Sequence, residues 1–501
     1  MKHELLYETQ SDFTAAQGNS GNVTSVTPGV AYVMETGSVP HFNKEYDDLV
    51  ITYVVNDISS PTKLYNVSEI KTNLKSVIID KEVIPVSSLT TTYQFENTGY
   101  HTVRYRYSSL TAIAASGFTN CSTITFVHFP DSLSGECFGR ATFMGTSLEK
   151  VEIPRKATVV SRDAFSGCTK LNTIIFKNTS NITVDVGAFA KVSVTDVYVD
   201  SDEAWMNIYW NDIIGVSSGI TRHKLYVNGE EVTTFNIPTS TTQISQYKFY
   251  GCYRIQHINL HDSITSIGRQ AFCDCAGLLE MIIPSSLTQT VLSGNTFHNC
   301  YSISNFINYS TVPIKGISNN NGFGAGTGLF ETYGDYDRSS GQNNLRFKNI
   351  IIHGNYTGGA YFLQTYYSLI DIKILGNTLL SPNSDNGLHY TYNNPGPAKL
   401  KFVEVLGNSE SNLLPVYGAT VCVSGCIVHL GYEGKISGNV NSVISSSTNT
   451  RNRVSKIYVG DGSSEEHDQA ILQEYLADSD WSTVSSKLDI WYNYHGEYRQ
   501  E

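Results

Sequence analysis

Phenylalanine residues recur through the middle of the chain at nearly regular intervals, and the positions that follow them share a pattern. A cysteine comes three residues after five of the seven phenylalanines, an aliphatic residue often comes six after, and apolar residues come nine and eleven after. Apolar positions that alternate with other side chains predict a short β-strand with one buried face. The seven residues are Phe118, Phe143, Phe165, Phe189, Phe249, Phe272 and Phe297, with one much longer interval between the fourth and fifth.

This spacing predicts a solenoid, because it falls within the roughly 20 to 29 residues per unit that are typical of leucine-rich repeats. Such units cannot bury their apolar faces alone, so they stack into one continuous core. A proline often ends the unit, as at Pro130, Pro154 and Pro284. The fold class is therefore predicted to be mainly β.

One cysteine per unit in the same position favours packing in the core, because free cysteine behaves as a small apolar residue. A metal centre would need ligands that converge from different directions, whereas stacking distances leave a disulfide between neighbouring units open. Cys273 lies outside the repeated position, and we expect it to point away from its neighbour. The repeated cysteines are Cys121, Cys168, Cys252, Cys275 and Cys300.

The segment ITSIGRQAFCDCAGLLEMIIPSS, residues 264–286, resembles the repeat of the BspA-like leucine-rich repeat family almost position by position. The resemblance extends over residues 108–310. Residues 197–238 are similar to a spacer found within such arrays, which would account for the longer interval. The resemblance implies a leucine-rich-repeat-type solenoid across this region.

Strand-like segments continue over residues 311–460, each an apolar run that ends in glycine. A glycine at the end of a strand suits a turn that needs a positive φ. We therefore expect the solenoid to continue there in a degenerate form. The glycines are Gly354, Gly376, Gly407, Gly431 and Gly460.

Residues 461–501 are predicted to form a C-terminal cap that contains a short helix. Ser463 and Glu466 resemble a capping box, and apolar residues then recur at helical spacing. Solenoid ends need a cap, and we expect the apolar and aromatic residues here to cover the last coil. They are Ala470, Ile471, Tyr475, Leu476, Trp481, Trp491 and Tyr492.

Residues 46–107 alternate as strands do and predict a small β domain; the segment TTYQFENTGYHTVRYRY resembles the closing hairpin of Ig-like or PKD-like sandwiches. Residues 1–45 predict an extended attachment arm or short strands, with a disordered tail as the alternative. Residues 5–9 and 26–43 are similar to the N-termini of tail and appendage proteins of Bacteroidales phages, including crAss-like phages.

The composition excludes some partners. The formal net charge is -12, which opposes a nucleic-acid partner, since such binding depends on lysine and arginine. Charged residues make up 16% of the chain, and its 32 tyrosines contribute to the polar surface. We expect no membrane insertion, because no apolar run is long enough, and no signal peptide, because the N-terminus lacks an apolar segment.

The sequence offers few candidates for chemistry. Glu331, Asp335 and Asp337 could lie at a groove, as in glycan-cleaving β-solenoids, but a solvated acidic loop is the simpler interpretation. The glycine-rich residues 322–328 do not fit a phosphate-binding motif. Cys422 and Cys426 have zinc-like spacing without a second pair nearby. We therefore expect no catalytic residue, cofactor or metal.

Alternation along each repeat strand predicts an outer, concave face opposite the core. Concave strand faces are the usual binding surfaces of solenoids, although an ordinary polar sheet face would show the same pattern. The predicted face comprises Phe126, His128, Lys150, Glu152, Thr173, Ile175, His257, Asn259, His261, Glu280 and Ile282.

These features lead to the hypothesis of a non-enzymatic phage virion protein, a tail fibre or a tail or head appendage. Its N-terminal region would bind other virion proteins, and its solenoid a host-surface glycan or protein. A homo-oligomer is expected, with a trimer as one option. The alternatives are a bacterial cell-surface adhesin and a glycan-degrading depolymerase.

Overall fold

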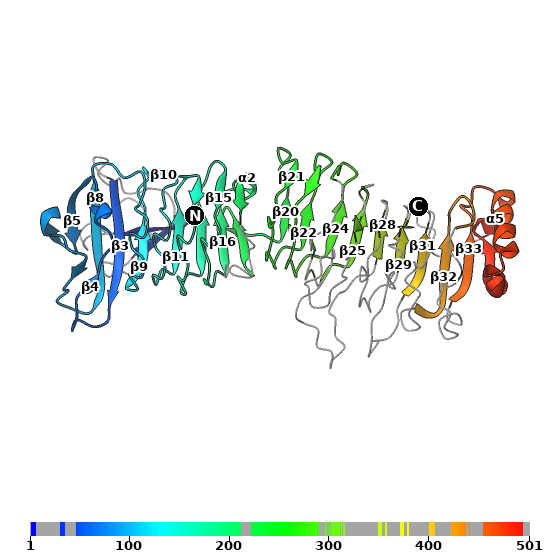
Figure 1. Cartoon of the computed structure of the whole chain (residues 1–501), viewed down its shortest axis with the longest axis horizontal. Coiled ribbons are helices and arrows are strands. Elements are labelled where there is room, and N and C mark those ends of the chain that lie inside the picture. Colours follow the sequence, from blue (N-terminus) through cyan, green and yellow to red (C-terminus); the bar gives the residue numbers. More distant parts are fainter. Residues whose placement is uncertain are drawn as a thin grey trace. The chain divides into compact units, whose positions relative to one another are not determined.

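The chain divides into two compact units, Met1–Val232 and Thr233–Glu501, and each is described by itself. Figure 1 shows the computed structural model, in which both units are built mainly from short strands stacked side by side. It describes residues 2–6, 31–35, 47–211, 222–289, 296–297, 300, 302–310, 312, 314–315, 349–352, 356–357, 371–374, 378–379, 400–405, 422–436, 440 and 454–493.

The first unit begins with an antiparallel sheet of order β6-β5-β8-β3-β9. Its strands are β3 (Asp47–Val55), β5 (Leu74–Ile79), β6 (Glu82–Ile84), β8 (Gly99–Tyr107) and β9 (Ile124–His128). One face buries Tyr53 and Tyr105, whose hydroxyls lie 3.1 Å apart. The short 3-10 helices η1 (Ser68–Lys71) and η2 (Val86–Ser88) connect these strands. Two further strands, β1 (Lys2–Leu6) and β2 (Ala31–Glu35), pair antiparallel with each other.

The expected closing hairpin is not formed. β7 (Thr92–Tyr93) pairs with β4 (Thr62–Lys63), whereas β8 pairs with β3 and β5. The connection between β7 and β8 thus crosses from one sheet to the other. The turn residues between β7 and β8 predicted a change of chain direction. Alternation within a strand, however, does not specify which other strand it pairs with.

The N-terminal sheet continues directly into the first repeat, because β3 pairs antiparallel with β9 as well as with β8. β9 is the strand that follows the first repeat phenylalanine. β3 therefore pairs with the edge of the first coil. A solenoid end that is covered in this way does not expose the backbone groups of its last strand.

The repeats of the first unit form a parallel sheet from β11 to β18, which ends in the antiparallel strand β19. Its strands are β11 (Lys150–Ile153), β14 (Thr173–Phe176), β16 (Asp196–Val199), β18 (Lys224–Val227) and β19 (Glu230–Glu231). Shorter ladders form the other sides of the coils: β10 (Ser134–Gly135) with β12 (Lys156–Ala157), and β13 (Val159–Val160), β15 (Ile182–Val184) and β17 (Ile208–Trp210).

Residues 197–238 were expected to form a spacer, yet part of this segment belongs to the stack. β16 pairs with β14, and β18 pairs with β16 in the same register. Between them lie β17 and the helix α2 (Asp202–Met206), whose N-cap Ser201 accepts a hydrogen bond from the Ala204 amide. The boundary between the two units also falls in this segment.

Stacked phenylalanines form the axis of both cores. Successive rings lie 5.1 to 5.7 Å apart between centroids and within 14° of parallel, as from Phe118 to Phe189 and from Phe249 to Phe297. Offset stacking of this kind stabilises beyond the burial of area alone. The repeat spacing therefore places one aromatic ring directly over the next.

The repeated cysteines lie beside this stack, buried and free. Thiols of three of them lie within hydrogen-bonding distance of the carbonyl oxygen of the phenylalanine one coil earlier: Cys168 to Phe143 at 3.1 Å, Cys275 to Phe249 at 3.0 Å and Cys300 to Phe272 at 3.1 Å. Burial raises the pKa of these thiols. The packing interpretation is thus supported, with a weak hydrogen bond between coils.

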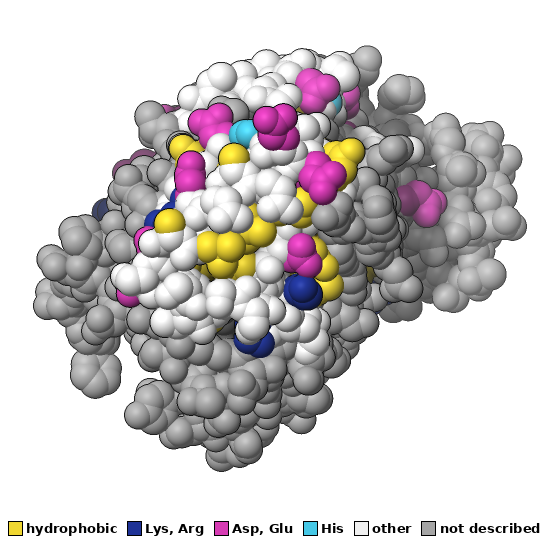
Figure 2. Space-filling model, turned by 90° about the vertical axis from the view of Figure 1, so that its right-hand side faces the viewer, with side chains coloured by type: hydrophobic (Ala, Val, Ile, Leu, Met, Phe, Trp, Pro, Cys, Tyr) yellow, Lys and Arg dark blue, Asp and Glu magenta, His cyan; other side chains and the backbone are white. Residues whose placement is uncertain are grey.

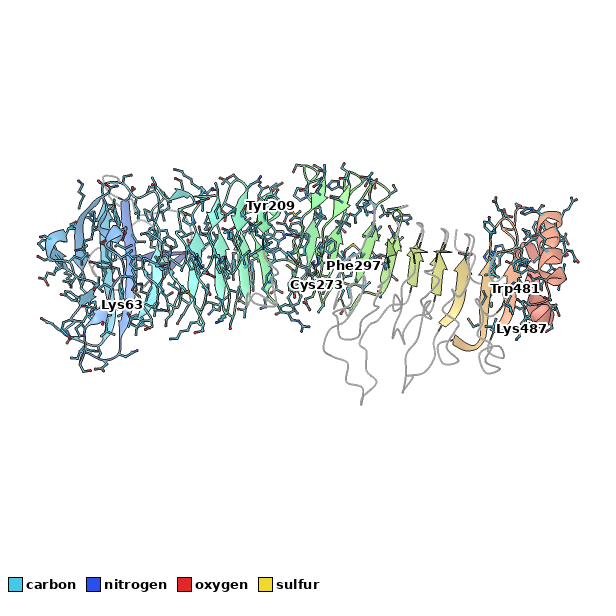
Figure 3. All side chains as sticks on the ribbon, viewed as in Figure 1. Lys63, Tyr209, Cys273, Phe297, Trp481 and Lys487 are labelled. Carbon is cyan, nitrogen blue, oxygen red and sulfur yellow. The ribbon has the colours of Figure 1, made fainter. Side chains whose placement is uncertain are left out.

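The turns from Phe118 to Phe272 each have a left-handed backbone on both sides of the phenylalanine. Two residues before the ring, Ala141 and Gln270 have φ of 56° and 53°, and two residues after, Asp274 has φ of 59°. Gly145 and Gly167 occupy the latter position in other coils. Cys273 lies inside this turn, buried and outside the repeated cysteine position, with its thiol directed at the Asp274 carboxylate at 3.5 Å (labelled in Figure 3).

The second unit contains a ten-stranded sheet whose neighbouring strands are all parallel. In Figure 1 they follow one another in chain order. They are β20 (Thr234–Asn236), β22 (His257–Asn259), β24 (Glu280–Ile283), β25 (Asn305–Asn308), β27 (Asn349–Ile352), β29 (Asp371–Ile374), β31 (Leu400–Val405), β32 (Cys422–Leu430), β33 (Val454–Val459) and β34 (Leu488–Ile490). Strands from residues 311–460 thus join the sheet that begins in the recognisable repeats.

Shorter parallel ladders accompany this sheet. They are β21 (Gln243–Ile244) with β23 (Ser266–Ile267), and β26 (Ile314–Lys315), β28 (Tyr356–Thr357) and β30 (Thr378–Leu379).

A helix closes the second unit, as expected, but it begins one residue later than the capping box predicted. α5 (Glu465–Ala477) has Ser464 as its N-cap, which accepts from the His467 amide at 3.1 Å. Tyr475 and Trp481 are fully buried and meet edge to face. The 3-10 helices η3 (Trp481–Lys487) and η4 (Trp491–Asn493) follow α5.

Acidic side chains are distributed over the capped end of the second unit (Figure 2). Exposed examples are Asp461, Glu465, Glu466, Glu474 and Asp480. Charge on the last element of a solenoid discourages the end from pairing with another copy. Within the described part of the chain, none of the helices is both long and apolar enough to cross a membrane.

Candidate binding face

The outer face of the first unit consists of two columns of side chains on the parallel sheet. Register places Lys150, Thr173, Asp196 and Lys224 side by side in one column. Glu152, Ile175, Tyr198 and Tyr226 form the other column. The residues between them, Val151, Ile174, Val197 and Leu225, are buried in the core. Alternation in the sequence therefore assigned the outward side correctly on β11 and β14.

Tyr198 and Tyr226 also belong to this face, although they are not among the residues that the sequence predicts for it. Their rings stack with centroids 4.3 Å apart and planes 8° from parallel. Burial, with a hydrogen bond to Asp196, raises the pKa of Tyr226, so its hydroxyl stays protonated. Both tyrosines lie in the segment that was interpreted as a spacer. Period-2 alternation in DVYV and KLYV was the signal that could have revealed them.

The charges on this face are paired with one another. The Lys150 ammonium lies 3.2 Å from the Glu152 carboxylate, and the Lys224 ammonium lies 4.0 Å from that of Glu231 on β19. Partly exposed pairs of this kind add little stability, but they leave the face close to neutral.

Phe126 and His128 lie on β9 and face the same side as Thr52 and Val50 of β3, with which they pair. His128 is exposed and Phe126 is half-buried. β9 runs antiparallel to β3, and the N-terminal sheet therefore extends this side of the repeat beyond its first strand. The sequence did not indicate that β9 pairs with β3, because the two strands are far apart along the chain.

The outer face of the second unit contains His257 and Glu280, which are neighbours in register, followed by Asn305. The Asn305 amide donates to the Glu280 carboxylate at 3.5 Å. Asn259 is exposed, and its side-chain amide donates to the side-chain oxygen Oδ1 of Asn236 at 2.7 Å. Paired polar side chains in adjacent strands are a common way to order an exposed sheet face.

Ile282 is 40% exposed on this face, and Ile307 lies next to it in register. His261 is not on the sheet, because β22 ends at Asn259. Its Nε2 lies 3.1 Å from the Pro238 carbonyl and its Nδ1 accepts from the Ser263 amide, so the side chain stabilises the turn. The prediction that His261 lies on the outer face is therefore wrong, because it continued the alternation two residues past the end of β22.

The C-terminal end of the same face is covered by the protein itself. His429 on β32 is 2% exposed. Its Nδ1 lies 2.9 Å from the Glu404 carboxylate, and its Nε2 donates to the Gly460 carbonyl at 2.8 Å. The Trp491 ring stacks on the imidazole with centroids 3.7 Å apart. Trp491 therefore packs on the outer side of the last strands, where it excludes a partner.

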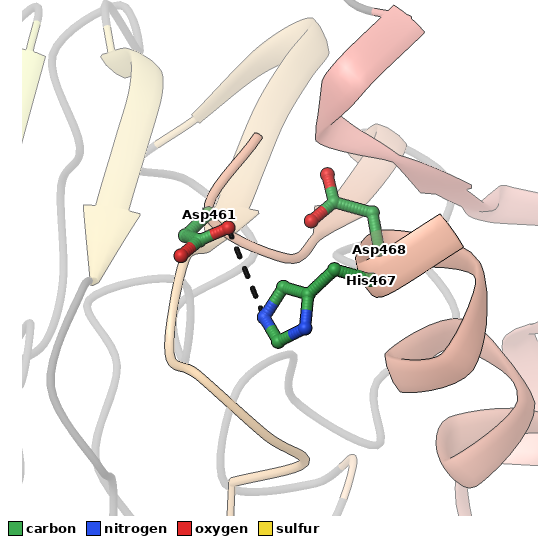
Figure 4. Close-up of side chains that lie close together, drawn as sticks. All are labelled: Asp461, His467 and Asp468. Carbon is green, nitrogen blue, oxygen red and sulfur yellow. Dashed lines mark ion pairs between the residues drawn. The ribbon is translucent and has the colours of Figure 1, made fainter. Parts of the chain in front are cut away.

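One cluster of potential metal ligands occurs among the described residues: Asp461, His467 and Asp468 (Figure 4). Asp468 is fully buried, and its carboxylate accepts from the amides of Gly462 at 3.2 Å and Tyr492 at 2.9 Å. His467 Nε2 lies 3.8 Å from Asp461. A carboxylate satisfied by backbone amides stabilises the first turn of the helix, and this arrangement anchors α5 to the last coil.

The other candidates for chemistry that the sequence offered are an acidic loop, a glycine-rich segment and a cysteine pair. Glu331, Asp335, Asp337 and residues 322–328 fall outside the described residues. Cys426 is buried and free on β32, which also contains Cys422.

The stacked coils and their outward-facing parallel strands define a leucine-rich-repeat solenoid. The family model described as "BspA type Leucine rich repeat region" matches residues 88–207 and 221–320 in six copies. Over these residues the chain is therefore similar to BspA-type leucine-rich repeats. The match begins before the predicted start of the repeats and includes the expected spacer except for residues 208–220.

Comparison with known proteins gives few further likenesses. No curated protein matches the chain. A leucine-rich repeat protein from Bacteroides ovatus is 16% identical over 41% of this chain and 76% of its own, with a TM-score of 0.21. The pneumococcal vaccine antigen PcpA is 13% identical over 72% and 70%, with a TM-score of 0.31. A leucine rich cell surface protein from Faecalibacterium prausnitzii is 15% identical over 69% and 86%, with a TM-score of 0.25.

Proposed function

We propose that this chain is a non-enzymatic attachment protein that presents the outer faces of its repeat sheets to a surface molecule of another cell. The observation that carries the proposal is the in-register array of outward side chains on parallel strands. Aliphatic, aromatic, amide and charged groups are interspersed there, which suits recognition by many weak contacts. Figure 3 shows the side chains along both units.

We propose further that the protein is a phage virion component, a tail fibre or a tail or head appendage. The support is the similarity of residues 5–9 and 26–43 to phage appendage proteins. In this role the N-terminal region binds other virion proteins and the chain assembles as a homo-oligomer. The alternative is a bacterial cell-surface adhesin, which is favoured by the BspA-type repeats.

Peptide mass spectrometry separates these two locations. Density-purified phage particles and washed cell envelopes from the same culture are digested and compared. Peptides of this chain at a fixed ratio to the major capsid protein support the virion role. Recovery from envelopes alone would refute it and establish the adhesin alternative.

A binding assay tests the attachment role itself. Labelled full-length protein is added to intact host cells, and the double variant His257→Ala, Glu280→Ala is compared with the wild type. We expect at least tenfold weaker binding if these residues contribute contacts of typical hot-spot strength. Tyr209→Ala is the control, because Tyr209 is 41% exposed on β17, which belongs to a different sheet. Cells that bind none of the proteins would refute the attachment role.

A further inference from the structure

The stacked pair Tyr198 and Tyr226 forms an aromatic centre on the outer face of the first unit. The two residues lie in different coils and become neighbours only through the register of β16 and β18. Val197 and Leu225, which flank them, are buried, so the tyrosines stand on the opposite, outward side. Ile175 lies next to Tyr198 in the same column and adds apolar area.

Hydrogen-bonding groups surround this aromatic centre. Burial, together with the charge of Asp196, raises the pKa of both tyrosine hydroxyls, and the Asp196 carboxylate accepts a hydrogen bond from the Thr195 hydroxyl at 2.6 Å. Thr173 and Lys224 flank Asp196 in the adjacent column. The Tyr226 hydroxyl, the Asp196 carboxylate and the Lys224 ammonium group can each form further hydrogen bonds. The centre therefore offers both donors and acceptors beside ring carbons.

The centre has almost no net charge. The two lysines, Lys150 and Lys224, are each paired with a glutamate, so the Asp196 carboxylate contributes the one negative charge that remains. An anionic partner would meet three carboxylates, and a cationic partner would meet two ammonium groups that are already close by. Like-charge contacts of either kind oppose binding. Electrostatics thus favours a neutral partner.

We propose that this tyrosine centre binds a neutral glycan chain that lies across the strands of the sheet. A sugar ring without charge combines apolar C–H groups with hydroxyls that both donate and accept, which matches tyrosine rings bordered by a carboxylate, a threonine and an ammonium group. Neighbouring strands are about 4.8 Å apart, so the four strands from β11 to β18 can contact several sugar residues in a row. The proposal rests on the proposed attachment function and specifies its ligand class.

Affinity electrophoresis of the full-length protein through gels that contain a soluble polysaccharide tests this assignment. The neutral probes are mannan, dextran, galactan and a mixed-linkage β-glucan, and the anionic probes are alginate and heparin. We expect at least one neutral probe to retard the wild type and Tyr226→Ala to weaken that binding at least tenfold. Tyr226→Phe keeps the ring and removes the hydroxyl, so its loss should be smaller.

Tyr209→Ala serves as the matched control, because it removes a tyrosine of the same unit from a different sheet. Circular dichroism of each variant verifies the fold before binding is compared. Equal retardation of wild type and Tyr226→Ala by a neutral probe would overturn the assignment. Stronger retardation by the anionic probes, or none by any neutral probe, would also overturn it.

Failure of this inference can be distinguished from failure of the attachment role. If intact host cells bind the wild type and Tyr226→Ala equally while His257→Ala, Glu280→Ala binds weakly, attachment stands and the tyrosine centre is not its glycan site. If protease treatment of the cells abolishes binding and no neutral polysaccharide retards the protein, the partner is a protein. If cells bind no form of the chain, the attachment role itself is wrong.

Discussion

Lys248 is a charged side chain in a position that other coils fill with small residues. It directly precedes a repeat phenylalanine, where Ala164, Ala188 and Ala271 stand in other coils, and it is only 1% exposed. Burial lowers the pKa of Lys248 to about 7. An unprotonated lysine at neutral pH costs free energy, because the unfolded chain would bind the proton.

We predict that Lys248→Met stabilises the protein at neutral pH. The pKa of Lys248 falls from 10.5 in the unfolded chain to about 7 in the folded protein. At about 1.4 kcal/mol per pKa unit, burying this lysine lowers the free energy of unfolding by roughly 5 kcal/mol at a pH well below 7. At pH 7 about 4 kcal/mol of this remains, which is large beside the roughly 5 to 15 kcal/mol stability of typical domains. The unfolded state binds more protons between pH 7 and 10.5, so the wild type gains stability as pH rises through this window.

Urea unfolding of the wild type and Lys248→Met at pH 7 and pH 10 measures this effect. The advantage of the variant should be several kcal/mol at pH 7 and should nearly disappear at pH 10. Taking the difference between the two proteins cancels the titration of shared tyrosines and cysteines. Lys191→Met is the control, because Lys191 is exposed in a corresponding turn. A variant advantage that is absent at pH 7, or equal at both pH values, would refute the reasoning.

Three further changes test the packing of the coils. Phe272→Leu should cost about 1 to 3 kcal/mol in urea unfolding, because it removes two ring stacks of about 0.5 to 1.5 kcal/mol each; a smaller loss would show that burial alone matters. Gly268→Ala should cost about 1 to 3 kcal/mol, because the added Cβ meets the backbone nitrogen of Gln246; an unchanged thermal midpoint would contradict this close approach. His429→Ala should cost about 3 to 5 kcal/mol, because it removes one member of the buried pair that His429 forms with Glu404; tryptophan fluorescence during unfolding measures it, and a neutral effect would argue against the buried pair.

Several features of the fold follow from residue spacing alone. The nearly regular interval between phenylalanines predicted the stacked coils, because identical units bury their apolar faces only against one another. The single repeated cysteine position predicted a packed thiol, which the structure places at hydrogen-bonding distance from the coil before it. Alternation on β11 and β14 predicted which side chains face outward. These are local properties of each repeat, so the sequence contains them.

Other features depend on contacts between distant segments, which alternation does not specify. Tyr198 and Tyr226 become neighbours only because the coil between them closes to the right length, and the expected spacer concealed that register. β3 pairs with β9 although several other elements separate them along the chain, so the outer side continues into the N-terminal sheet. Trp491 covers His429 because the chain returns over the sheet after its last strand. Residue spacing thus specifies the repeating unit, whereas contacts between distant segments select which outward side chains stay open to a partner, since that depends on what packs beside them.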